Sequence, residues 1–258
     1  MISVSVDNKK QLNEVLDIKE VSEVIISRDS FADTEILSLL SDIKNKGKVA
    51  TLMFETITRL SQNDEQKRLS DILNSNEVDS IIVQNINSFF YILNNIDKEC
   101  KITFNYNMNI YNKYSKQYYI DCCKEKNIDC RFVAPVELSF NELKDNNYDY
   151  ILVYGYLPLM VSKNCIFKNT GKCQHNSYGT IYDRMNIGFR FRSYCNFCYN
   201  KIFNSVPIDI RNVGLQSISI ANKRYDFSFE DPTMIKPIIF NQFDIQNKTY
   251  GHYKNSVI

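Results

Sequence analysis

Four cysteines in the second half of the chain have a spacing that suits metal binding. Cys165, Cys173, Cys195 and Cys198 form the pattern C-x7-C-x21-C-x2-C. A C-x2-C pair can chelate one metal ion through two thiolates. Zinc sites usually contain two such pairs and this stretch contains one, whereas irregularly spaced cysteines also suit an iron-sulfur cluster. The spacing alone therefore leaves three alternatives open, which are an iron-sulfur cluster, zinc and no metal.

The residues around these cysteines are basic and aromatic. Residues 163–201 contain seven Lys or Arg and one acid, although the net charge of the whole chain is only +1. Aromatic rings interleave with the cations, and this mixture suits unpaired bases stacked on rings with phosphates on the cations. We therefore expect RNA contacts from Lys168, Lys172, Arg184, Arg190 and Arg192. A small hydrophobic core around a metal, kept soluble by its charges, explains the same pattern equally well.

The remaining cysteines and the N-terminus bear on the compartment. We interpret Cys100, Cys122, Cys123 and Cys130 as small apolar residues buried by helices and strands. Eight cysteines in 258 residues are too few for a disulfide scaffold, and the first residues lack a signal-peptide pattern. The longest apolar run, residues 150–161, is too short to span a bilayer. We predict a cytoplasmic, reduced protein without membrane insertion.

Short apolar runs alternate with amphipathic segments along the chain, which predicts an α/β fold. The length and the number of candidate strands match a TIM-like (β/α) barrel. Nearly continuous apolar runs are typical of parallel strands buried on both faces. The expected strands are residues 2–6, 23–27, 49–54, 80–84, 101–106, 131–136, 150–155 and 217–221, and the expected helices are 9–16, 32–46, 65–73, 111–126 and 140–145.

The regular spacing of these elements is interrupted once, after the seventh expected strand. About 60 residues separate the seventh strand from the eighth, and all four spaced cysteines lie between them. Long connections of this kind usually carry function. We therefore predict a single domain, residues 1–258, with a cysteine-rich basic insertion at about 156–212.

Catalytic groups of a barrel enzyme come from the carboxyl ends of its strands. The chain has no HExxH, GxSxG, Walker A or GxGxxG motif. The strand ends instead supply polar candidates, each of which also reads as a loop residue or a helix cap. They are Arg28, Glu55, Asn85, Asn105, Asn107 and Glu137. We favour Glu137, which follows an expected strand and should point toward the barrel mouth.

Several segments of the chain resemble a known protein family. The strongest are VYGYLPLMVSKNC from Val153, GKC, IYDR and CNFCYNKIFNSVPIDI from Cys195. Others are ISVSVDNKKQLNEVL from Ile2, FNYNMNIYN from Phe104, APVELSFNEL from Ala134 and TYGHYKNSV from Thr249. Together they are similar to the collagenase-like peptidases of family U-32, and they cover nearly the whole chain.

The resemblance implies more than peptidase activity. Several relatives carry a 4Fe-4S cluster on four cysteines and take part in oxygen-independent hydroxylation of RNA pyrimidines or of a quinone precursor. By this resemblance, Cys165, Cys173, Cys195 and Cys198 are the expected cluster ligands, with zinc as the alternative. Glu137, Arg184 and His252 are candidates for positioning a substrate. The implied fold is a barrel related to the (β/α) type.

Two departures from the family pattern are visible. The usual signature has a cysteine where this chain has Pro158, three residues after Gly155, and Cys165 follows seven residues later. Longer relatives also carry an N-terminal module that this chain does not resemble. The sequence thus supports three hypotheses: an iron-sulfur protein that contributes to RNA base hydroxylation, a peptidase of unknown mechanism, and a non-catalytic subunit that binds RNA or a partner chain.

Overall fold

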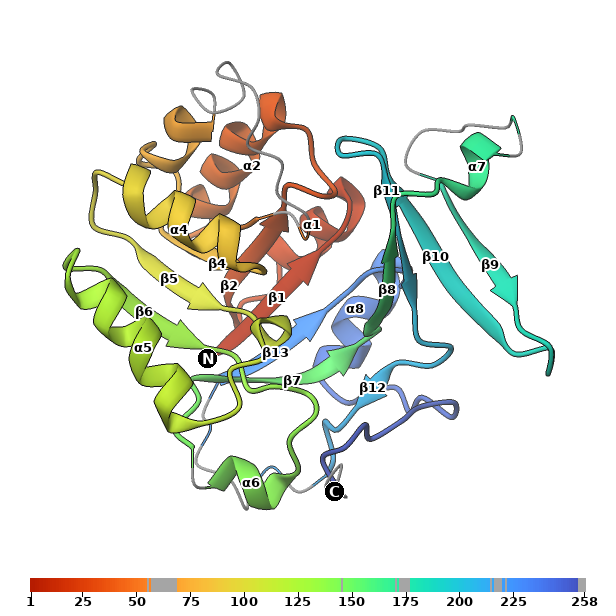
Figure 1. Ribbon diagram of the computed structural model, residues 1–258. Helices are drawn as coiled ribbons and strands as arrows, with labels where there is room; N and C mark the ends of the chain where they lie inside the picture. The colour runs from red at the N-terminus through yellow and green to blue at the C-terminus, as the bar shows by residue number, and fades with distance from the viewer. Residues whose placement is uncertain are drawn as a thin grey trace.

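The protein consists of one large curled sheet covered by helices and one small sheet beside it. The computed structural model describes residues 1–54, 56, 69–144, 146–169, 171, 177–213, 215, 220 and 222–254. Figure 1 shows the small sheet at one side of the large one, next to the ends of its strands. The α/β class expected from the alternating pattern is confirmed.

The large sheet has nine strands in the order β12-β7-β13-β1-β2-β3-β4-β5-β6. All neighbouring pairs in it are parallel except β12 with β7. The strands are β1 (Ile2–Val6), β2 (Val21–Ser27), β3 (Val49–Met53), β4 (Ser80–Val83), β5 (Lys101–Phe104), β6 (Asp129–Phe132), β7 (Tyr150–Gly155), β12 (Ile208–Asp209) and β13 (Asn222–Asp226).

The large sheet curls until its far strand reaches back toward β7. A parallel bridge joins Val133, just after β6, to Tyr150 at the start of β7. Ala134 N also donates to Tyr150 O at 2.8 Å, and Asp149 N donates to Phe132 O at 2.9 Å. Strands β1 to β7 and β13 therefore form a curled, mostly parallel sheet whose carboxyl ends face one side.

Helices cover the outer face of this sheet because their apolar sides pack on it. They are α1 (Lys9–Leu16), α2 (Asp33–Asn45), α4 (Ile86–Asn95), α5 (Lys113–Lys124), α6 (Phe140–Lys144) and α8 (Pro232–Ile239). Asparagine side chains cap three of them, at Asn8, Asn85 and Asn112, by accepting hydrogen bonds from the first turn. Within the described ranges, no helix combines the length and apolarity that crossing a bilayer requires.

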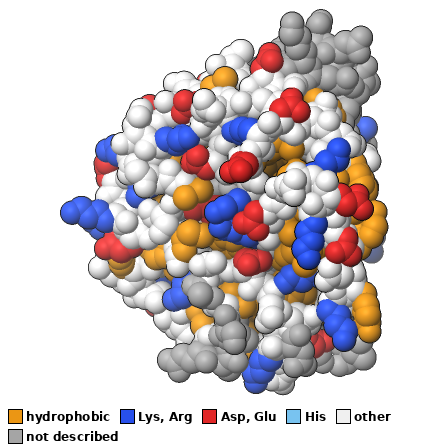
Figure 2. All heavy atoms as spheres, turned by 90° about the vertical axis from the view of Figure 1, so that its left-hand side faces the viewer, with side chains coloured by type: hydrophobic (Ala, Val, Ile, Leu, Met, Phe, Trp, Pro, Cys, Tyr) orange, Lys and Arg blue, Asp and Glu red, His pale blue; other side chains and the backbone are white. Residues whose placement is uncertain are grey.

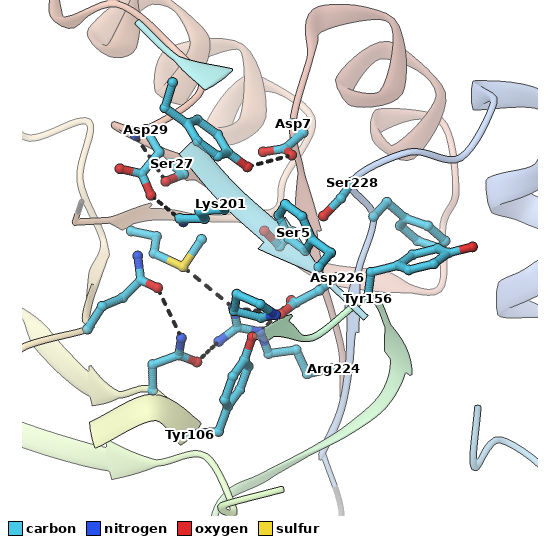
Figure 3. Close-up of a pocket in the computed structure, with 17 residues that line it drawn as sticks. Ser5, Asp7, Ser27, Asp29, Tyr106, Tyr156, Lys201, Arg224, Asp226 and Ser228 are labelled. Carbon is cyan, nitrogen blue, oxygen red and sulfur yellow. Dashed lines mark hydrogen bonds and ion pairs between the residues drawn. The ribbon is translucent and has the colours of Figure 1, made fainter. Parts of the chain in front are cut away.

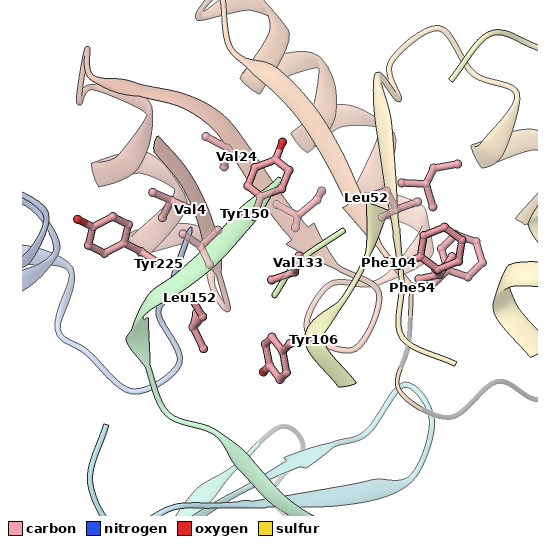
Figure 4. Packing of buried hydrophobic residues seen from close by; sticks show 14 of the residues in the cluster. Val4, Val24, Leu52, Phe54, Phe104, Tyr106, Val133, Tyr150, Leu152 and Tyr225 are labelled. Carbon is pink, nitrogen blue, oxygen red and sulfur yellow. The ribbon is translucent and has the colours of Figure 1, made fainter. Parts of the chain in front are cut away.

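The main hydrophobic core lies between the sheet and these helices. Its members come from nearly every strand, and Figure 4 shows Val4, Val24, Leu52 and Leu152 among them. Every residue of β4 and β7 is buried, as expected for strands covered on both faces. On the helix-covered face in Figure 2, acidic and basic side chains are mixed without a large region of one sign.

The small sheet contains four antiparallel strands in the order β8-β11-β10-β9. They are β8 (Pro158–Ser162), β9 (Tyr178–Tyr182), β10 (Gly188–Tyr194) and β11 (Tyr199–Phe203), and the short helix α7 (Ile166–Asn169) follows β8. In the chain, these elements lie between β7 and β13. The predicted insertion, residues 156–212, therefore spans the small sheet and also β12, which returns to the large sheet.

Seven of the expected strands are present with shifts of a few residues at their ends. The expected eighth strand, residues 217–221, lies outside the described residues except for Ile220, which is not in a strand. The eighth parallel strand is β13, which begins one residue later. Of the expected helix at 65–73, the described residues 69–73 are helical. Helices α4 and α8 were not predicted from the sequence.

Candidate functional site

Three of the four spaced cysteines lie at the same end of the small sheet. Cys195 and Cys198 occupy the turn between β10 and β11, and Cys165 follows the end of β8. The β8 and β11 strands are paired at Ser162 and Asn200, close to this end. The Asn200 side chain also donates to the carbonyl of Asn164 at 2.7 Å, so the segment before Cys165 is held against the β11 strand.

Cys173 lies outside the described residues, but the segment that follows it returns to this same end. Ser193 N donates a hydrogen bond to Ser177 O at 2.9 Å, one residue before β9 begins. Of the described cysteines, Cys165 and Cys195 are half-buried and Cys198 is exposed. No cluster of three or more His, Cys, Asp or Glu that could hold a metal ion occurs within the described ranges.

The turn that carries Cys195 and Cys198 packs against the carboxyl ends of the strands of the large sheet, which we call the mouth. Asn196, between the two cysteines, donates to Phe31 O at 3.0 Å and to Arg28 O at 3.4 Å. The Phe197 ring lies 5.3 Å from the guanidinium carbon of Arg28. Arg28 is buried and makes a two-fold hydrogen bond to the Asp33 carboxylate at 3.0 and 2.9 Å. Arg28 therefore positions the cysteine turn.

Two buried ion pairs join the small sheet to the large one. Arg192 contacts the Asp7 carboxylate at 2.6 Å, and Lys201 contacts the Asp29 carboxylate at 2.6 Å. Asp7 and Asp29 follow strands β1 and β2, so each sits at a carboxyl end. Buried carboxylates need partners of this kind, because an unpaired charge in the interior is costly.

Two tyrosines of the small sheet complete these pairs. Tyr194 donates to Asp7, and Tyr199 donates to Asp29. Burial and the neighbouring carboxylates raise the pKa of both hydroxyls well above the usual value, so both stay protonated donors. Burial opposes the charge on Arg192, but Asp7 outweighs it and the pKa of Arg192 is raised. Near neutral pH, Arg192 therefore stays charged and both tyrosine hydroxyls stay neutral.

A small polar pocket opens at the mouth, between the two sheets (Figure 3). The centres of water molecules can occupy about 40 Å³ of this pocket, so it has room for a few waters. Its floor contains Arg224, which is buried and donates to Asp226 at 2.7 Å and to Asn105 at 2.9 Å. Lys201 enters from the small sheet. The lining includes Asp7, Asp29, Gln84, Tyr106 and Ser228.

The expected catalytic candidates Glu137 and His252 line a second cavity beside this pocket. That cavity has about 520 Å³ open to the centre of a water molecule, and Tyr106 and Pro158 line both spaces. Glu137 is half-buried and His252 is exposed. The third candidate, Arg184, is exposed in the turn between β9 and β10 and lines neither space.

The side chains that are expected to contact RNA differ in exposure and in their contacts within the protein. Lys168 and Arg184 are exposed, and Lys172 lies outside the described residues. Arg190 stacks over Tyr156 and Phe229 at 5.0 and 5.3 Å. Arg192 is engaged by Asp7, with a second hydrogen bond to the Asp7 carbonyl at 2.9 Å. Lys168 and Arg184 are therefore best placed to meet an anion.

The strand-end candidates also take different roles. Asn85 caps α4 by accepting from Ser88 N at 2.8 Å, and Glu55 lies outside the described residues. Asn105 belongs to the pocket floor. Four residues of this pocket were not predicted from the sequence: Asp7, Asp29, Arg224 and Asp226. Asp7 directly follows an expected strand, so extending the strand-end rule to that position would have found it.

Comparison with known proteins agrees with the family resemblance. Residues 26–238, which include most of the large sheet and all of the small one, match the family model described as Peptidase family U32. The chain belongs to peptidase family U32. No curated protein sequence matches the chain. The matched residues include all four spaced cysteines and the whole small sheet.

Proposed function

We propose that this U32 protein binds a 4Fe-4S cluster through Cys165, Cys173, Cys195 and Cys198. The observation that carries the proposal is that three of these cysteines, and the residue that leads from the fourth into β9, lie at one end of the small sheet. Thiolates are the ligands that such clusters use. The donor set therefore fits the cluster better than it fits magnesium or calcium, which prefer oxygen.

The position of the cysteine turn suggests what the cluster serves. Asn196 and Phe197 hold the turn against Arg28, next to the polar pocket at the mouth. A cluster there would supply electron transfer or Lewis acidity. Asp29, Lys201 and Arg224 would orient a bound group, because their charges are held by buried partners.

We further propose that the protein contributes to oxygen-independent hydroxylation of an RNA base. Support comes from the exposed cations Lys168 and Arg184 and the exposed rings of Tyr178 and Tyr182 on the small sheet. Exposed rings and cations on one sheet suit single-stranded nucleic acid. The chain would act in the cytoplasm, alone or with a partner subunit.

We also propose that the large sheet forms a TIM-like (β/α) barrel. Eight parallel strands follow one another around the large sheet, and the bridge between Val133 and Tyr150 would close the circle from β6 to β7. Catalytic groups of such barrels gather at the carboxyl ends of the strands. Asp7, Asp29 and Arg224 occupy that position here.

Nucleoside analysis tests the proposed reaction. RNA from cells grown without oxygen, with and without this protein, is digested and compared by mass spectrometry. We expect one pyrimidine nucleoside that is heavier by one oxygen to disappear without the protein. The wild-type chain and Cys122→Ala should restore it, and Cys195→Ala should not. Nucleosides that do not change, or full restoration by Cys195→Ala, would contradict the proposal.

A further inference from the structure

The cavity lined by Glu137 and His252 has no role in the function proposed above. Its walls come from the segments after β5, β6, β7 and β11, from the start of β8, from β12, and from the C-terminal segment. Five apolar side chains contribute to the lining: Val136, Leu157, Pro158, Leu159 and Ile208. At about 520 Å³ open to the centre of a water molecule, it can hold a small organic molecule.

The C-terminal segment is fixed in place as a wall of this cavity. Thr249 accepts a backbone hydrogen bond from Asp209 at 3.0 Å and donates one to Pro207 at 2.9 Å. Gly251 has a φ of +56°, and a Cβ there would lie 3.1 Å from Ile208 Cδ1. A larger residue would strain this turn, so glycine lets the segment approach β12 closely.

Two hydrogen-bond acceptors in this cavity have no donor. Glu137 Oε2 and Asn107 Oδ1 are both buried from solvent and lack a hydrogen-bond partner within the described ranges. Glu137 also makes no ion pair with a described residue. Buried polar atoms are nearly always paired with protein or with water, so these two acceptors at one cavity call for a donor from a water or from a ligand.

The orientation of the Asn107 amide follows from its neighbours. Arg224 donates to Asn105 Oδ1, so Asn105 turns its amide nitrogen toward Gln84 Oε1 at 3.5 Å. Gln84 is fixed in turn, because its own amide nitrogen donates to Phe54 O at 2.5 Å. Gln84 Oε1 then also accepts from the Asn107 nitrogen at 3.4 Å. The orphan atom of Asn107 is therefore its carbonyl oxygen.

A ligand for this cavity must bring donors, because both orphan atoms accept. The carboxylate of Glu137 favours a donor with positive charge, and the apolar lining favours a hydrocarbon body. We propose that the cavity binds a protonated primary amine carried on a small branched apolar group. The amine would donate to Glu137 Oε2 and Asn107 Oδ1 together. This inference does not depend on the cluster or on RNA.

Two probes of equal size test this site on the full chain. Isoamylamine and isoamyl alcohol have the same apolar body and differ in charge. Ligand-observed NMR titration of the wild-type protein should show the amine binding about tenfold more tightly than the alcohol, as expected for charge-assisted hydrogen bonds. Equal affinities for the two probes would overturn the proposal, and this comparison needs no variant.

Variants then locate the binding. Glu137→Gln keeps the size of the side chain and removes its charge, so the preference for the amine should disappear. Glu125→Gln, at an exposed position after α5, is the matched control and should retain that preference. Circular dichroism confirms that each variant is folded. An amine affinity that is the same in folded Glu137→Gln and in the wild type would place the binding elsewhere and overturn the assignment.

Discussion

At the scale of single residues, the basic stretch contains two kinds of cation. Arg192, which is largely buried, and Lys201, which is buried, pair with Asp7 and Asp29, whereas Lys168 and Arg184 are exposed. Sequence charge alone cannot separate them, because their acidic partners lie more than 170 positions away in the chain. The buried cations join two sheets, and the exposed ones are available to a ligand.

Removing one member of a buried pair should lower stability strongly. Lys201→Met leaves the buried Asp29 carboxylate without its cation, so we expect the free energy of unfolding to fall by about 3 kcal/mol. Urea denaturation of the purified protein measures this change. Lys46→Met is the control, since its pair with Asp17 is exposed and should change stability little. Similar losses in both variants would contradict the account.

Burial was predicted for four cysteines outside the small sheet, and it holds for two of them. Cys100 and Cys123 are buried, whereas Cys122 and Cys130 are half-buried. Burial raises the pKa of the Cys100 thiol to about 11, which keeps it protonated and unreactive. A hydrogen bond with Cys130, together with burial, raises the pKa of Cys123. These thiols differ from the half-buried or exposed cysteines of the small sheet.

At the scale of elements, apolar runs identified the strands that are buried on both faces. The exception is β13, whose sequence NKRYD is mostly polar. Arg224 of this strand belongs to the pocket at the mouth and pairs with Asp226, so its polarity reflects the site. The eighth strand was therefore predicted at the apolar residues 217–221, just before β13. Functional positions break the local pattern that marks a strand.

Two helices were also missed, because their sequences lack the usual pattern of a surface helix. The sequence of α4, INSFFYILNN, is largely apolar, and it lacks the charged face that made the other helices visible. Helix α8 contains Pro237 in its interior, and an interior proline usually argues against a helix, whereas Pro232 at its first position is compatible with a helix start. The small sheet was not predicted as strands at all, because its rings and cations indicated binding chemistry instead.

The two sheets should loosen locally when one of their ion pairs is removed. Asp7→Asn takes the negative charge from Arg192 and weakens the bond from Tyr194, both in β10. Hydrogen exchange should become at least about tenfold faster in β10 and β11 and remain unchanged in β4 and β5. Asp17→Asn, at an exposed pair, should change neither region. Equal acceleration in both regions of Asp7→Asn would indicate global destabilisation instead.

At the scale of the whole molecule, the small sheet connects the cysteine end to the strand ends of the large sheet. Asn196 and Phe197 contact the loop after β2, and Lys201 reaches the mouth pocket (Figure 3). Composition and spacing predicted the α/β class of the large sheet and the cysteine-rich segment. Their contact could not be predicted, because it depends on ion pairs between residues far apart in the sequence.

The central claim is that the four spaced cysteines hold a 4Fe-4S cluster. Iron, zinc and acid-labile sulfide are measured in anaerobically purified full-length protein, together with its visible absorption. We expect about four iron and four sulfide per chain in the wild type and in Cys122→Ala, and a large loss of both in Cys195→Ala. Wild-type protein without iron and sulfide, or with zinc and no sulfide, would contradict the claim.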